Sequence, residues 1–165
     1  MELSKQVGAF TLVPEYDGNR DLPESERLSL TIKPLRRLDL MAQMGWLHNA
    51  DEVYRWRDEE LKQWINNPAY GKEINQLPLE LLIGMRQFVG QTSEFRNFLV
   101  DGRALEDPAE VFLNIAGETG DTTLIGEIQD AITQTAILNG DELKNFVRQC
   151  GGSSNEIAKD AATAD

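Results

Sequence analysis

The sequence predicts an α+β protein: a small antiparallel sheet covered by several amphipathic helices, with a mainly helical C-terminal half. Three observations predict it. Residues Leu28–Lys33 alternate between apolar and polar side chains, residues Thr122–Leu138 carry an apolar stripe at helical spacing, and Asp107-Pro108-Ala109-Glu110 has the residue types of a helix start. We expect four to six helices in total.

The chain length fits one domain. The sequence has 165 residues, which is enough for a single hydrophobic core. We expect one α+β domain over residues 1–150, with a possible small N-terminal β part over residues 1–35. Residues 151–165 read GGSSNEIAKDAATAD, and such small polar residues predict a disordered tail.

The first third of the chain predicts two strands and a connection. Val7–Val13 is apolar on both sides, which favours a central strand. Residues 14–26 are acidic and rich in turn residues, and predict an exposed connection. Leu28–Lys33 then predicts a strand with one buried face and one wet face.

A helix is expected after this second strand. Pro34 ends the strand and is suited to the first position of a helix. The residues that follow at helical spacing, and that we expect on its buried side, are Leu35, Leu38, Met41 or Ala42, and Gly45. Arg36, Arg37 and Asp39 are expected largely on its outer side, and Gly45 is expected to end it.

The middle of the chain predicts two further helices. Residues 51–66 begin with the N-cap candidate Asp51 and place Trp56 and Trp64 near one face. Residues 66–76 are expected to form a loop. Pro78 then opens a helix that we expect to run to about Val89 and to end at Gly90.

The last third predicts a hairpin and three helices. Phe95–Val100 is extended, Asp101-Gly102 favours a tight turn, and Arg103–Leu105 leaves room for only a very short returning strand. The expected buried residues of the helices are Val111, Phe112, Ile115, Leu124, Ile125, Ile128, Ala131, Ile132, Leu138, Leu143, Phe146 and Val147. Asn139-Gly140 separates the long helix from a last short one.

Composition excludes several classes of function. The formal net charge is −12, which disfavours nucleic-acid binding because that affinity depends on Lys and Arg. One cysteine excludes an internal disulfide, and one histidine excludes a His-rich zinc site. No apolar run approaches the roughly 20 residues that span a bilayer. We expect a cytoplasmic protein without membrane contact or cofactor.

Four segments invite a chemical interpretation, and each has a simpler one. The acidic run Asp58-Glu59-Glu60 spreads around a helix and suits a solvated face. Ser25, Ser29, Ser93 and His48 lack the local motif of a nucleophile. Cys150 lies near a predicted helix C-terminus, which does not activate a thiol. The glycines of Gly117–Gly126 lack the Gly-Lys-Ser/Thr of a phosphate loop. We therefore expect no catalytic, metal or cofactor residue, and a protein that is not an enzyme.

The tryptophans are the candidates for partner binding. Trp46, Trp56 and Trp64, with Arg55 and Arg57 beside Trp56, match the residue types that anchor interfaces. Core packing is the alternative for all three tryptophans. The connection at 14–26 and the tail at 151–165 are further candidates for segments that order on binding.

Three segments resemble a known group of proteins. GNRDLPESERLSLTIKPL (Gly18–Leu35) has an N-R-x-L-P loop before an alternating strand. NFLVDGRALEDPAEVF (Asn97–Phe112) and TAILNGDELKNF (Thr135–Phe146) supply a turn before an amphipathic helix and a final E-x-K-N helix. In pattern and order, these segments resemble small proteins of tailed-phage and prophage morphogenesis modules, most closely the tail assembly chaperone group.

The resemblance implies a non-enzymatic protein of virion assembly that holds apolar segments of a tail protein before polymerisation. Its partners would be other phage morphogenesis proteins, and self-association is compatible with it. Two alternatives stay open from the residues: a structural ring-forming subunit of a tail or connector, and a cytoplasmic adaptor or regulatory domain.

Overall fold

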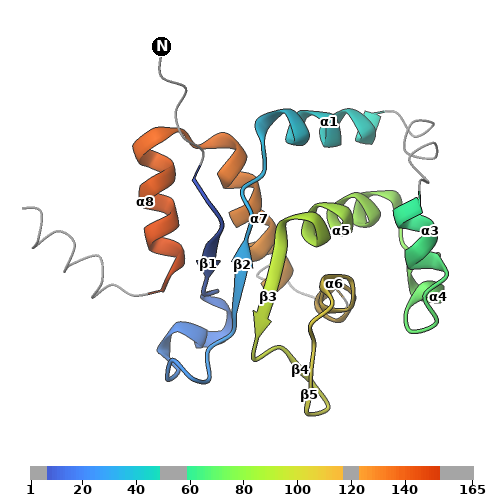
Figure 1. The fold of residues 1–165 in the computed structure, drawn as a ribbon, viewed down its shortest axis with the longest axis horizontal. Helices are drawn as coiled ribbons and strands as arrows, with labels where there is room; N and C mark the ends of the chain where they lie inside the picture. The colour runs from blue at the N-terminus through green and yellow to red at the C-terminus, as the bar shows by residue number, and fades with distance from the viewer. Residues whose placement is uncertain (1–6, 49–58, 117–122, 153–165) are drawn as a thin grey trace, which may run out of the picture.

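The computed structural model confirms an α+β fold. It describes residues 7–48, 59–116 and 123–152. Within these residues it has a three-stranded antiparallel sheet, a two-stranded hairpin, one 3-10 helix and seven α-helices, which is more than the four to six expected (Figure 1). The elements are β1 (Phe10–Leu12), η1 (Tyr16–Asp21), β2 (Ser29–Ile32), α1 (Arg37–His48), α3 (Glu59–Ile65), α4 (Gly71–Ile74), α5 (Leu79–Gln91), β3 (Thr92–Arg96), β4 (Leu99–Val100), β5 (Arg103–Ala104), α6 (Pro108–Ala116), α7 (Leu124–Ile137) and α8 (Gly140–Cys150).

The three-stranded sheet has the order β1-β2-β3. Phe10 pairs with Ile32, and Ile32 pairs in turn with Thr92. The prediction of a central strand over Val7–Val13 is therefore wrong, because β1 is an edge strand and β2 is central. Leu12 and Val13 at the end of this segment are buried; α8 lies beside β1, and the backbone N–H of Val13 donates to the carbonyl of Cys150 at 2.7 Å.

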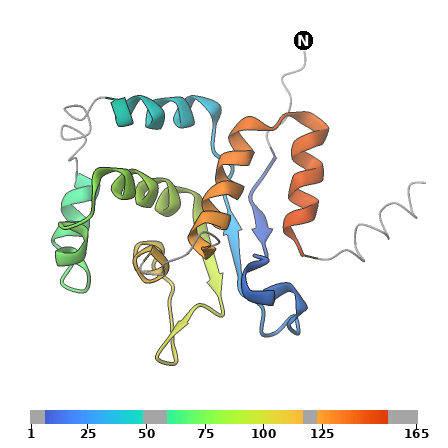
Figure 2. The ribbon, with the colours of Figure 1, turned by 180° about the vertical axis from the view of Figure 1, so that it is seen from behind.

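One face of the sheet is buried and the other is polar. Leu12, Leu30 and Ile32 are buried, and the views from the two sides show α7 crossing behind the strands (Figures 1 and 2). Thr31, on the opposite side of β2, donates to the carboxylate of Glu94. The alternation predicted for residues 28–33 is thus confirmed.

The core is organised around Phe88 of α5. Its ring lies 5.5 Å from that of Phe112 in an edge-on arrangement and is stacked with that of Phe95 at 6.0 Å. Phe98 meets Phe95 edge-on at 5.3 Å. Four aromatic side chains from α5, β3, the segment after β3 and α6 therefore form one cluster, in geometries that aromatic quadrupoles favour.

The predicted hairpin and helix start are confirmed. Asp101 (φ 49°) and Gly102 (φ 77°) both adopt the left-handed conformation and form the tight turn between β4 and β5. At the start of α6, one oxygen of Asp107 accepts the N–H of Ala109 at 3.0 Å. The other accepts the hydroxyl of Tyr70 at 3.0 Å, and burial together with this bond raises the pKa of Tyr70 to about 12.

The last two helices follow the predicted order. Thr123 caps α7 by accepting the N–H of Gly126, and the apolar stripe of α7 is buried. Leu143 of α8 is buried, while Phe146 packs partly buried against the core. Of the tail predicted over residues 151–165, all but the first two residues lie outside the described residues.

The start of α1 and its buried side differ from the prediction. The helix begins at Arg37 and continues past Gly45 to His48. Leu35 is buried as expected, but Leu38 and Met41 are 73% and 61% exposed. Contacts with α5 and α7 set the rotation of this helix, and they turn Leu40 and Gln43 inward instead.

The segment expected as a loop over residues 66–76 contains the short helix α4. Tyr70 and Ile74 are buried there, and the chain reverses tightly after α3. A Cβ on Gly71 would lie 2.0 Å from the carbonyl oxygen of Ile65. Only glycine therefore fits at this position.

We predict that Gly71→Ala destabilises the protein by at least about 1–3 kcal/mol, because the added methyl group meets backbone that must move. Urea unfolding followed by circular dichroism measures the change. Gly90→Ala in α5 is the matched control, because no atom lies within 4 Å of its Cβ position. We expect this substitution to leave the free energy of unfolding unchanged or to raise it by up to about 1 kcal/mol, since alanine is favoured over glycine in a helix. Equal effects of the two substitutions would contradict the packing argument.

Candidate interaction surfaces

Of the residues predicted to bind a partner, the structure describes the side chain of Trp64. Arg55, Trp56 and Arg57 lie outside the described residues, as does the start of the helix predicted over 51–66. Trp46 lies in α1, but its side chain is not among those described. Trp64 is 9% exposed and belongs to the hydrophobic core, which favours the core-packing alternative for this residue.

The connection at residues 14–26 is more ordered than predicted. It contains η1, in which Asp17 and Gly18 adopt left-handed conformations. Asn19 at its centre is 3% exposed. Its amide nitrogen donates to the carbonyls of Pro14 (2.9 Å) and Leu28 (3.0 Å), and its amide oxygen accepts the N–H of Leu28 at 2.7 Å. Asn19 thus closes the loop onto the start of β2.

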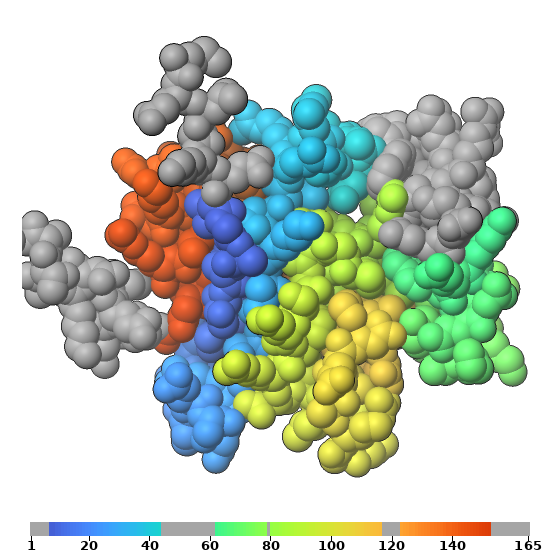
Figure 3. All heavy atoms as spheres, in the orientation of Figure 1, coloured from blue at the N-terminus to red at the C-terminus, as the bar shows by residue number. Residues whose placement is uncertain are grey.

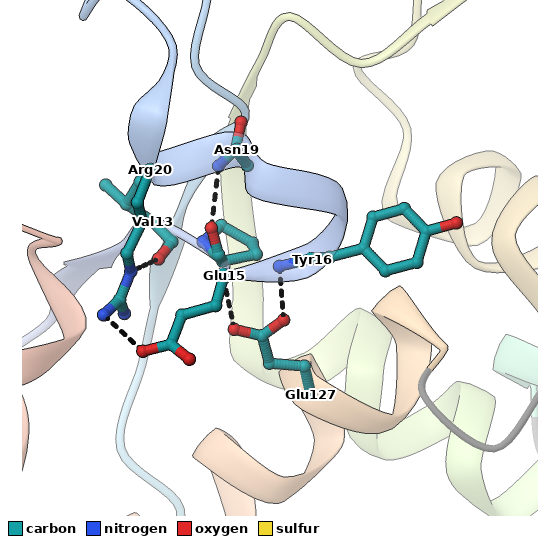
Figure 4. Close-up of polar contacts among 7 residues, drawn as sticks. Val13, Glu15, Tyr16, Asn19, Arg20 and Glu127 are labelled. Carbon is teal, nitrogen blue, oxygen red and sulfur yellow. Dashed lines mark hydrogen bonds and ion pairs between the residues drawn. The ribbon is translucent and has the colours of Figure 1, made fainter.

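Two further side chains hold this loop against the rest of the molecule (Figure 4). Arg20 donates to the carbonyl of Val13 at 2.8 Å and pairs with Glu15 at 2.8 Å. Glu127 of α7 accepts the backbone N–H groups of Glu15 (2.5 Å) and Tyr16 (3.1 Å). The Asn-Arg pair of the N-R-x-L-P pattern therefore has a structural role in this chain.

A groove lies between this loop and the beginning of α7. Its lining includes four carboxylates, from Glu15, Asp17, Glu127 and Asp130. Glu15 and Glu127 are engaged in the loop contacts above. The groove is strongly acidic, and Tyr16 is the one large aromatic side chain among its lining residues.

A second surface has the opposite character. Leu38 and Met41 point to solvent from α1, and Ile137 at the end of α7 is 48% exposed. Arg37 joins the two helices by donating to the carbonyl of Ile137 at 3.1 Å. We call Leu38, Met41 and Ile137 the apolar patch. The space-filling view shows α1 along one edge of the molecule, where it faces solvent (Figure 3).

The residues considered for chemistry are not brought together where the structure describes them. Ser29 and Ser93 lie on the sheet, paired with Arg96 and Thr31, and the side chain of His48 is not described. Among the described residues, no group of three or more His, Cys, Asp and Glu is placed to hold a metal ion.

Cys150 ends α8 and is 4% exposed. Burial raises the pKa of its thiol to about 11; Glu127 adds to this effect and Arg20 opposes it. The thiol is therefore protonated and inaccessible at neutral pH, as expected for a cysteine without a chemical role.

Comparison of the chain with protein-family models, with curated proteins and with solved structures finds no match. Within the described residues, no helix has both the length and the apolar character needed to cross a bilayer.

We predict that Asn19→Ala destabilises the protein by about 2–4 kcal/mol, because the substitution leaves buried backbone groups of Pro14 and Leu28 without partners. The midpoint of urea unfolding measures the loss. The control is Asn114→Ala, which removes one exposed hydrogen bond within α6 and is expected to cost less than about 0.5 kcal/mol. A similarly small effect at Asn19 would show that the loop closes without it.

We predict that Cys150 reacts with a thiol reagent such as 5,5′-dithiobis(2-nitrobenzoate) at least about a hundredfold more slowly in the native protein than in urea at pH 8, because burial limits access and raises the thiol pKa. Absorbance of the released thiolate follows the reaction. The denatured protein serves as the control, and comparable rates in the two states would contradict the burial of this side chain.

Proposed function

We propose that this chain is a non-enzymatic phage or prophage protein that acts through protein–protein contacts in tail assembly, as a chaperone-like factor in the host cytoplasm. The observation that carries the proposal is the orientation of α1. This helix turns Gln43 inward, where it accepts a hydrogen bond from Gln87 at 3.0 Å, and turns Leu38 and Met41 outward.

That orientation is the reverse of what burial alone favours. Moving a large apolar side chain out of water stabilises a protein by roughly 1.5–3 kcal/mol. Two such side chains exposed on one side of a helix therefore support an interaction site there. Ile137 extends the apolar patch onto α7. The patch supports a role in holding an apolar segment of another protein.

The resemblance of three segments to the tail assembly chaperone group gives the proposal its biological setting. The net charge of −12 is compatible with it, because a strongly charged chain stays dispersed while it holds an apolar partner. The partner segment is expected to dock on α1 as a helix docks on an apolar face.

A ring-forming tail or connector subunit is the second candidate. One observation favours it: carboxylates gather at the beginning of α7, whereas Arg37 binds its end. Opposite charges at the two ends of α7 would favour head-to-tail contact between copies, and such contact closes into rings when the rotation permits.

We predict that the purified chain is a monomer or dimer by light scattering across a range of concentrations. On co-expression, it should raise the soluble fraction of a tail protein encoded beside it. The double variant Leu38→Ser/Met41→Ser should lose most of this rescue, because the apolar contact is removed. Leu99→Ser is the matched control, since Leu99 is also 60% exposed but lies on β4.

Two results would count against the proposal. A discrete ring-sized assembly of the chain alone would favour the structural subunit. If the chain raises the soluble fraction of no neighbouring gene product, the chaperone role is without support and an adaptor role is favoured.

A further inference from the structure

A basic groove adjoins the apolar patch. It lies where α1 begins, α7 ends and α8 begins, at one end of the molecule (Figures 1 and 2). Its lining residues are Val7, Pro34, Leu35, Arg36, Arg37, Thr135, Ala136, Leu138, Asn139, Gly140, Leu143 and Lys144. Arg37 belongs to its wall and contacts the carbonyl of Ile137, and Leu38 of the apolar patch follows Arg37 directly in α1.

The charge of this groove is opposite to that of the chain. Among the described residues that line it, three are cations, Arg36, Arg37 and Lys144, and none is a carboxylate. Asp39 pairs with Arg36 at 2.7 Å from the neighbouring turn, and Asp141 and Glu142 follow Gly140 in the first turn of α8; none of these three carboxylates belongs to the lining. The whole chain has a net charge of −12, so this local excess runs against its composition.

The backbone adds to the positive potential. α8 begins at Gly140 inside the groove, and the first N–H groups of a helix carry a partial positive charge. The opposing negative end of α7 is covered, because Arg37 donates to the carbonyls of Ala136 and Ile137.

We propose that this surface binds an acidic amphipathic helix of the assembly partner; the inference rests on the proposed function and specifies its ligand. The apolar side of the partner helix covers Leu38, Met41 and Ile137. Its carboxylates lie toward Arg36 and Lys144. Leu38 and Met41 are three residues apart and share one face of α1, which suits the apolar stripe of a second helix.

A second copy of the chain fits this surface less well. Its acidic groove offers carboxylates, but among its lining residues only Tyr16 has a large apolar side chain. Such a contact would leave the apolar patch largely uncovered. An acidic amphipathic helix satisfies both the charge and the apolar area.

The experiment is a selection from a displayed library of random peptides of about 16 residues, about 24 Å long when helical, on the full-length chain. The same library is selected on Arg36→Glu/Lys144→Glu, on Leu38→Ser/Met41→Ser, and on the controls Lys72→Glu and Leu99→Ser. Lys72 is exposed on α4, well away from the groove in Figure 1. Circular dichroism and thermal unfolding establish that each variant is folded.

We expect the wild-type chain and both controls to enrich peptides with acidic residues on one helical side and apolar residues on the other. The two surface variants should bind these peptides at least about tenfold more weakly, the loss that interface anchors typically show. Binding by the wild type should weaken with salt, because the charges lie near the surface.

Three other outcomes would overturn the inference. The first is no enrichment, or enrichment of basic or uncharged peptides. The second is enrichment that both surface variants share with the wild type. The third is a different occupant of the surface. This occupant would be a synthetic peptide of residues 153–165 or a second copy of the chain, provided that Arg36→Glu/Lys144→Glu abolishes its binding. If that variant still rescues the tail protein on co-expression, the proposed function stands and this inference falls.

Discussion

The contact between Phe88 and Phe112 is the constraint on which most of the described fold depends. Both side chains are completely buried, and together they bring α5 and α6 against each other while Phe95 attaches β3 to the same cluster. A buried phenylalanine contributes roughly 1.5–3 kcal/mol through apolar burial, and aromatic geometry adds to this. The sheet is small, so its position relative to the helices is set by these aromatic contacts more than by the strands themselves.

Local chemistry predicted the elements whose determinants are close together in the sequence. The alternation of Leu30 and Ile32, the turn at Asp101-Gly102 and the cap at Asp107 each need only a few consecutive residues, and all three are confirmed. The order within the connection at 14–26 was not predicted, because its closure depends on Asn19 reaching Leu28 and on Glu127, which lies 111 residues beyond Tyr16. Turn-rich composition describes the loop but does not reveal these partners.

The candidate surface was predicted least well, and for the same reason. Helical spacing placed Leu35, Leu38 and Met41 on one side, but Leu35 lies before α1 and is buried, whereas Leu38 and Met41 are exposed. Spacing alone cannot tell which side of a helix meets the core when both sides carry apolar residues. Tertiary contacts with α5 and α7 decided the rotation and exposed the side expected to be buried. The tryptophan hypothesis rested on residue type alone, and residue type does not distinguish an interface anchor from a core residue such as Trp64. The Asn-Arg pair was noticed as a pattern, yet its structural role becomes visible only through the carbonyl groups it binds.

The contacts that complete the N-terminal third also determine when it can form. The N–H of Leu35 donates to the hydroxyl of Thr135, 100 residues later, and Val13 binds the carbonyl of Cys150 at the very end of α8. On the ribosome, β1 and β2 emerge long before either partner is synthesised. Contacts between residues so far apart in the sequence slow folding, because the chain loses conformational entropy on closing the loop before the contacts can stabilise it. The segment that carries β1 and β2 therefore gains these two contacts only after α7 and α8 have been synthesised.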